Sequence, residues 1–162
     1  SPEAWDAFTK EALGKGYKLE FLESTGLTIP RDDRPIDRFK GRVIFPIQSM
    51  SGRVLGFGGR ILTSDKKAAK YLNSPESEIY HKGKVLYGIF QAKQSIAKLN
   101  NCYLVEGYTD VIQFNQAGID NIVLIAEVIV FHECITSCTF TVRTRCAIVL
   151  RNGGVQAVFE SF

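Results

Sequence analysis

The spacing of apolar residues is helical at the start of the chain. Residues 3–26 carry apolar side chains at mixed intervals of three and four, which predicts two helices broken at Gly14 and Gly16. Thr25 and Gly26 then predict the end of the second helix. The charged segment 31–40 contains a proline and predicts a loop before the next element.

The pattern then changes to that of a β-sheet. Residues 42–47 and 53–57 are β-branched and aromatic runs separated by a short glycine turn, which predicts a β-hairpin. Pro46 places the first strand at a sheet edge or at a bulge. A third strand is expected at 60–62, after glycines that permit a bulge, a close approach of backbone or phosphate, or a sharply curved sheet.

Two further segments follow the predicted hairpin. Residues 64–84 are polar, cationic and partly aromatic, which predicts a long irregular loop suited to contact with nucleic acid. Residues 90–99 return to a helical pattern.

A strand, a helix and another strand are predicted at 102–106, 109–117 and 121–126. The first strand ends in Glu106, and acidic groups at the carboxyl end of a parallel strand are well placed to hold Mg²⁺. Glu106 could equally cap the following helix, and the spacing leaves both roles open.

Charge is distributed unevenly along the chain. Residues 1–99 hold 17 Lys or Arg against 11 Asp or Glu, whereas residues 100–162 hold three Arg against six acids. A basic stretch beside an acidic one fits a protein that binds a polyanion with one surface and a metal ion with another, although a solvated lysine-rich face has the same composition.

Composition narrows the class of protein further. No apolar run is long enough to span a membrane, and the first residues lack a secretory signal pattern. The chain opens without methionine, so we expect a piece of a longer protein. Because a secretory signal pattern is absent, the four cysteines are expected to be reduced thiols rather than disulfides. A zinc site of His132, Cys134, Cys138 and Cys146 is disfavoured, because these residues lack the paired spacing of structural zinc sites, and buried small apolar side chains are expected instead.

Five motifs occur in the order found in bacterial replicative DNA primases of the DnaG type. They are RFKGRVIFPI at 38–47, GRVLGFGGR at 52–60, KYLNSPE at 70–76, HKGKVLYG at 81–88 and EGYTDV at 106–111. The chain resembles this family over roughly residues 3–123, and an ordered five-part match is far more specific than any single motif.

The resemblance implies an α+β fold, with a basic amino-terminal primase-core subdomain over residues 1–99 and an incomplete α/β TOPRIM domain over residues 100–162. It implies a DNA-directed RNA polymerase that makes short RNA primers on single-stranded DNA from ribonucleoside triphosphates. The family works in the bacterial cytoplasm at the replication fork, with a replicative helicase and single-strand binding protein contacted through regions outside this chain.

The resemblance also assigns residues. Glu106 and Asp110 match the family's catalytic carboxylates, with Glu106 as a ligand of Mg²⁺ or Mn²⁺. Zinc belongs to a family domain that this chain lacks. The positions that match nucleotide-binding and template-binding sites are Arg60, Lys70, Tyr71, Asn73 and Lys82. Packing, turn formation or plain solvent exposure are the alternative roles of these side chains.

The resemblance ends after Val123. Residues 124–162 contain no Asp or Lys, so the family's second acidic pair is missing. A reading-frame shift or gene-prediction error would produce such a change, and we expect little or no polymerase activity from the chain as written. The alternatives are a catalytically defective fragment that only binds nucleic acid, or another TOPRIM enzyme such as a topoisomerase or nuclease, which the motifs at 38–88 disfavour.

Overall fold

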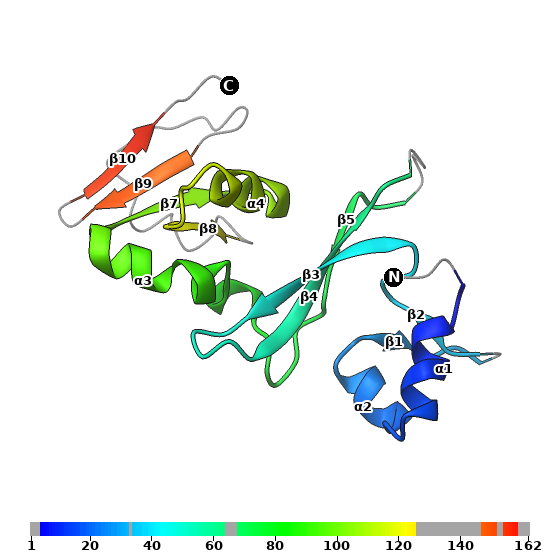
Figure 1. Ribbon diagram of the computed structural model, residues 1–162. Coiled ribbons are helices and arrows are strands. Elements are labelled where there is room, and N and C mark those ends of the chain that lie inside the picture. The colour runs from blue at the N-terminus through cyan, green and yellow to red at the C-terminus, as the bar shows by residue number, and fades with distance from the viewer. Residues whose placement is uncertain (1–3, 33, 64–67, 126–146, 152–153, 159–162) are drawn as a thin grey trace. The chain divides into compact units, whose positions relative to one another are not determined.

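The computed structural model describes residues 4–32, 34–63, 68–125, 147–151 and 154–158 (Figure 1). Helices and strands alternate irregularly, so the expected α+β class is confirmed. The chain forms two compact units, one of residues 1–46 and 55–81, the other of residues 47–54 and 82–162. None of the described helices is long and apolar enough to cross a membrane.

The first unit begins with two helices, α1 (Ala7–Gly14) and α2 (Leu19–Ser24), as the apolar spacing predicts. They pack against a two-stranded antiparallel sheet of β1 (Thr28–Ile29) and β2 (Ile36–Asp37). The prediction of a loop throughout 31–40 is therefore wrong at Ile36 and Asp37. A two-residue strand is too short to show an alternating pattern, and its pairing partner lies outside the segment.

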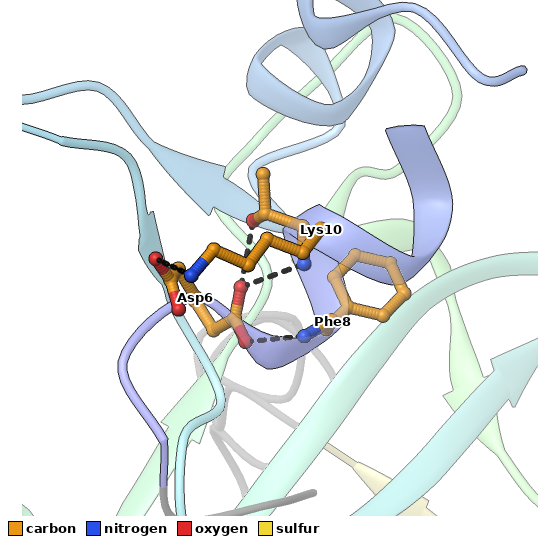
Figure 2. Close-up of polar contacts among 5 residues, drawn as sticks. Asp6, Phe8 and Lys10 are labelled. Carbon is orange, nitrogen blue, oxygen red and sulfur yellow. Dashed lines mark hydrogen bonds and ion pairs between the residues drawn. The ribbon is translucent and has the colours of Figure 1, made fainter. Parts of the chain in front are cut away.

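A buried carboxylate ties this sheet to α1. Asp37 is 3% exposed and accepts hydrogen bonds from the main-chain N–H groups of Phe8 (2.7 Å) and Thr9 (3.0 Å) and from the Thr9 hydroxyl (2.6 Å). The Thr9 hydroxyl also bonds that of Thr28 at 2.8 Å. Asp6, the N-cap residue of α1, makes no capping hydrogen bond with its side chain. Asp37 thus accepts the hydrogen bonds of main-chain donors at the start of α1. Figure 2 shows this contact at Phe8.

The predicted hairpin is present as β3 (Arg42–Gln48) and β4 (Val54–Ile61), with Gly52 in the left-handed region at φ 87° in the turn. A third strand, β5 (Tyr71–Asn73), completes the order β3-β4-β5. β3 is an edge strand, as Pro46 predicts.

The expected strand at 60–62 is wrong, because β4 continues without a break to Ile61. The glycines within β4 make room for packed side chains. A Cβ on Gly56 would lie 2.9 Å from the Tyr80 ring, and one on Gly59 would lie 2.6 Å from the Phe39 ring. The glycines therefore admit large neighbours against a continuous strand.

The prediction of an irregular loop over 64–84 is correct only in part. The segment contains β5, the one-turn helix η1 (Lys82–Lys84) and a buried Tyr80 that is 1% exposed. The alternation over β5 lasts only three residues, which is too short a pattern to predict a strand.

The second unit contains β6 (Leu86–Tyr87), α3 (Ile89–Leu99), β7 (Asn101–Val105), α4 (Tyr108–Gln116) and β8 (Ile122–Ile125). Its sheet has the order β10-β9-β7-β8-β6, with β9 (Ala147–Arg151) and β10 (Gly154–Val158) at one side. β7 and β8 are parallel, so the predicted βαβ unit is confirmed. The core between α3 and the sheet contains Ala92, Cys102, Leu104 and Val123.

Candidate nucleic-acid and metal sites

A cluster of two cations and an aromatic ring lies where β4 pairs with β5. Arg60 is the cross-strand partner of Tyr71, and Gly58 is the partner of Asn73. The Arg60 guanidinium carbon lies 5.6 Å from the centroid of the Tyr71 ring, and Lys70 Nζ lies 6.0 Å from it. We call Arg60, Lys70, Tyr71 and Asn73 the β4–β5 cluster.

The strand register explains why the sequence brings these residues together. Directly paired residues of antiparallel strands place their side chains on the same face, so Arg60 and Tyr71 are neighbours although eleven positions separate them. The Lys70 carbonyl accepts hydrogen bonds from the Ile61 N–H (3.1 Å) and from Arg42 Nη1 (3.4 Å), which fixes the start of β5.

The cluster carries two positive charges without a carboxylate partner among the residues that the structure describes. Arg60 and Lys70 make no ion pair with any carboxylate in the described part of the chain. The Tyr71 ring is 39% exposed. Cations beside an accessible ring suit a ligand that has both phosphates and planar bases.

Lys82 belongs to the other compact unit. It begins η1 and is half-buried, in the sequence Lys82-Gly83-Lys84. The cluster within the first unit therefore contains four of the five predicted nucleic-acid residues, and Lys82 is described with the second unit.

The predicted acidic residues lie at the carboxyl end of β7. Glu106 follows the last strand residue and is exposed, and Gly107 is the N-cap of α4. The cap position thus belongs to Gly107 rather than Glu106. Asp110 lies in the first turn of α4, where a carboxylate interacts favourably with the helix dipole.

Gly107 has a specific steric role between the two acids. A Cβ at this position would lie 2.6 Å from Asp110 Oδ2 and 3.0 Å from its Cγ. The Asp110 carboxylate therefore occupies the space above the turn that follows Glu106. A side chain at position 107 would therefore require the Asp110 carboxylate to move, although the main-chain φ of −114° would suit any residue.

Two carboxylates satisfy only part of the requirement for a divalent metal. Their hard oxygens suit Mg²⁺ or Mn²⁺, and they follow a strand that is parallel to β8. Among the described residues, however, no group of three or more His, Cys, Asp or Glu side chains could hold a metal ion. The fit is incomplete, so we assign these residues no step of a metal-dependent reaction.

The prediction of buried cysteines is confirmed at Cys102, the cysteine that lies among the described residues. Cys102 is a free thiol, buried between β7 and α3, and burial raises its pKa to about 11. His132, Cys134, Cys138 and Cys146, the residues of the disfavoured zinc interpretation, lie outside the described residues.

Sequence reasoning missed the cation–ring contact between Lys40 and Trp5. Lys40 Nζ lies 3.4 Å from the centroid of the Trp5 ring. The two residues are 35 positions apart, and no local pattern links them.

The fold is that of an α+β protein with two cations beside the Tyr71 ring on one sheet, followed by a βαβ unit with Glu106 and Asp110 after its first strand. A family model for the N-terminal domain of the DNA primase catalytic core matches residues 1–93. The chain belongs to this family, and the resemblance seen in the sequence is confirmed.

Individual relatives agree with the family. The chain is 46% identical over 123 residues to a DNA primase of Halalkalibacterium halodurans, covering 75% of this chain and 20% of that protein. It is 45% identical over 121 residues to a DNA primase of Escherichia coli K12, covering 74% of this chain and 20% of that protein. The chain therefore spans about a fifth of the length of these curated relatives.

Solved structures show the same fold. The RNA polymerase domain of Mycobacterium tuberculosis primase DnaG, in complex with double-stranded DNA, matches with a TM-score of 0.74 and 41% identity over 79% of this chain and 41% of that chain. The Escherichia coli primase catalytic core matches with a TM-score of 0.70 and 43% identity, with the same two coverages. A DnaG primase catalytic domain bound to single-stranded DNA matches with a TM-score of 0.68 and 43% identity over 77% of this chain and 40% of that chain.

Proposed function

We propose that this chain is part of the RNA polymerase core of a bacterial DNA primase, which synthesises short RNA primers on single-stranded DNA from ribonucleoside triphosphates. The β4–β5 cluster carries this proposal, because two cations without carboxylate partners in the described chain flank one exposed ring. Family membership supports primer synthesis over a topoisomerase or nuclease activity.

Each cluster residue has a chemical role in this proposal. Arg60 and Lys70 contact phosphates of the template or the nucleotide, where their charge releases counterions. Tyr71 offers a face on which a base can stack, and Asn73 offers an amide that can donate or accept hydrogen bonds. Lys82 provides a further cation for a nucleotide phosphate.

The acidic edge of β7 is the proposed metal-binding part. Glu106 and Asp110 would contribute two carboxylate ligands to Mg²⁺ or Mn²⁺, and the described residues bring no third possible ligand together with them. Zinc would belong to a separate domain of the longer protein. One structural relative, the primase of Aquifex aeolicus, is described by its zinc-binding and RNA polymerase domains.

The division at residues 99 and 100 and the start of a TOPRIM domain remain part of the proposal. So do action in the bacterial cytoplasm at the replication fork, and contacts of the longer protein with a replicative helicase and single-strand binding protein. The family match supports each of these without testing it.

A binding-only role is the second candidate function. Residues 124–162 contain no aspartate, and the described residues include no group of three metal-ligating side chains. Such a chain would keep the β4–β5 cluster and lack a complete metal site.

One experiment tests both candidates. The purified chain is titrated with Mg²⁺ or Mn²⁺ and assayed for primer synthesis on single-stranded DNA, while fluorescence anisotropy measures binding to the same DNA. Synthesis that Glu106→Gln abolishes would support the polymerase. Binding without synthesis would support the binding-only role, and the absence of binding would contradict both. Because Glu106 is exposed, Glu106→Gln should leave the fold unchanged, which circular dichroism checks.

A further inference from the structure

The tip of the β3–β4 hairpin, residues 47–54, belongs with helix α3 to the second compact unit and is held against that helix. A Cβ on Gly52, the glycine of the turn, would lie 2.8 Å from Cε2 of the Phe90 ring. Lys93 Nζ lies 4.5 Å from the centroid of the same ring. A side chain at position 52 would be strained by the φ of 87° and would also meet the ring, whereas a turn that contacts nothing would have only the first constraint.

Two side chains of α3 add hydrogen bonds to the hairpin tip. Lys93 Nζ donates to the carbonyl of Met50 at 2.8 Å, and Gln91 Nε2 donates to Gln48 Oε1 at 2.8 Å. Gln48 Nε2 in turn donates to the carbonyl of Gly52 at 3.1 Å. The helix therefore holds the tip at two points, the end of β3 and the turn.

The helix that holds the tip is itself fixed in the core of the second unit. Ala92 belongs to this core, and Ile89 and Ile96 pack against it. The residues that contact the tip alternate with these core residues along the helix. The contacts of the tip therefore depend on the folding of the second unit.

The strands of the hairpin continue from the tip into the first unit. β3 crosses the boundary between residues 46 and 47, and β4 crosses it between residues 54 and 55. The two strands are hydrogen-bonded neighbours, and β4 also pairs with β5, where Arg60 is the partner of Tyr71. One pair of strands therefore leads from the tip to the β4–β5 cluster.

We propose that the hairpin tip, through its contacts with α3, links the two compact units in folding, so that they unfold together in one transition. A pair of strands that is shared by two units loses its hydrogen bonds when either unit opens, which joins the two openings. The link makes the stability of the β4–β5 cluster depend on the core around α3. This inference concerns folding, and it holds whether or not the cluster binds nucleic acid.

Native-state hydrogen exchange at increasing urea concentrations tests this link. The reporters are the slowest main-chain amides of residues 28–37 in the first unit and of residues 101–105 in the second. In the native chain we expect both sets to exchange within about threefold of each other and with the same urea dependence, because a single opening exposes both. In the double variant Gln91→Ala/Lys93→Ala, which removes both hydrogen bonds from α3 to the tip, the two rates should separate by about tenfold.

The matched control is the double variant Gln94→Ala/Lys98→Ala. It replaces the same two residue types on the same helix, at exposed positions whose side chains make no hydrogen bond to the tip among the described residues. Alanine favours the helix, and circular dichroism checks that helical content persists in both variants.

Three results would overturn the inference. The two rates could already separate in the native chain, or they could stay together when the hydrogen bonds to the tip are removed. An equal separation in both double variants would assign the effect to α3 itself rather than to the tip.

Discussion

The helical region of the first unit and its β4–β5 sheet use charged side chains in opposite ways. In α1 and the segment that leads to α2, Lys10, Lys15 and Lys18 lie 3.1, 2.9 and 3.5 Å from carboxylates. In the sheet, Arg60 and Lys70 lie against the Tyr71 ring, with no carboxylate partner in the described chain. Positive charge is thus paired with carboxylates in one region, whereas in the other it lies beside an aromatic ring.

Substitutions of single charged residues test this contrast. The largest effect on stability is expected at Asp37, because its buried carboxylate accepts three hydrogen bonds. Asp37→Ala removes three hydrogen-bond acceptor contacts from donors at the start of α1. The buried N–H groups would lack a partner, so the free energy of unfolding should fall by about 3 kcal/mol. Urea unfolding followed by circular dichroism measures this. A loss below about 0.5 kcal/mol would show that water replaces the carboxylate.

The second prediction compares two cations of equal charge. Arg60→Ala should weaken binding to single-stranded DNA about tenfold and lower the salt slope of log Kd by about 0.7, as expected for one lost phosphate contact. Lys15→Ala should leave both unchanged, because Glu11 already neutralises that lysine. Anisotropy titrations over a series of salt concentrations measure both variants. Equal salt slopes of log Kd for Arg60→Ala and Lys15→Ala would contradict the distinction between a cation that is paired with a carboxylate and one that is not.

The third prediction concerns a titrating group that is buried in the second unit. The pKa of the Cys102 thiol rises from 9.0 to about 11 on folding, because burial disfavours the thiolate. The folded state therefore keeps its proton when the unfolded state has lost it, and stability is fully present below pH 9 and declines as the pH rises towards 11. Urea unfolding of the native chain and of Cys102→Ala should give curves whose difference narrows over this range. Parallel curves would contradict the predicted shift.

The long elements could be predicted from the sequence because their patterns extend over several turns or alternations. α3, α4 and the β3–β4 hairpin are examples. The two-residue strands could not be predicted, because β2 exists through pairing with β1 rather than through a pattern of its own. The glycines of β4 led to the wrong prediction of a separate strand at 60–62 for a related reason. They make room for the side chains of Phe39 and Tyr80, which lie far away in sequence.

The candidate sites show the same limit. The resemblance assigned Arg60, Lys70, Tyr71 and Asn73. The register of β4 and β5 pairs Arg60 with Tyr71, and Lys70 Nζ also lies 6.0 Å from the Tyr71 ring centroid. Their roles in binding stay predictions. The Trp5–Lys40 contact carried no signal in the sequence, because only the turn after β2 brings the lysine to the ring. The local spacing of residues therefore predicts helices and strands. Which cation lies beside which aromatic ring depends on strand pairing and turns between distant parts of the chain.

The close approach of Asp110 to Gly107 has a consequence for how this segment can vary over generations. A methyl group at position 107 would meet a carboxylate oxygen at 2.6 Å, so a side chain there requires the Asp110 carboxylate to move away from the turn. We therefore expect substitutions at position 107 to act first on the placement of the Asp110 carboxylate. In a library that randomises both positions and selects for folded, functional clones, single changes at 107 should be rare while aspartate is kept at 110.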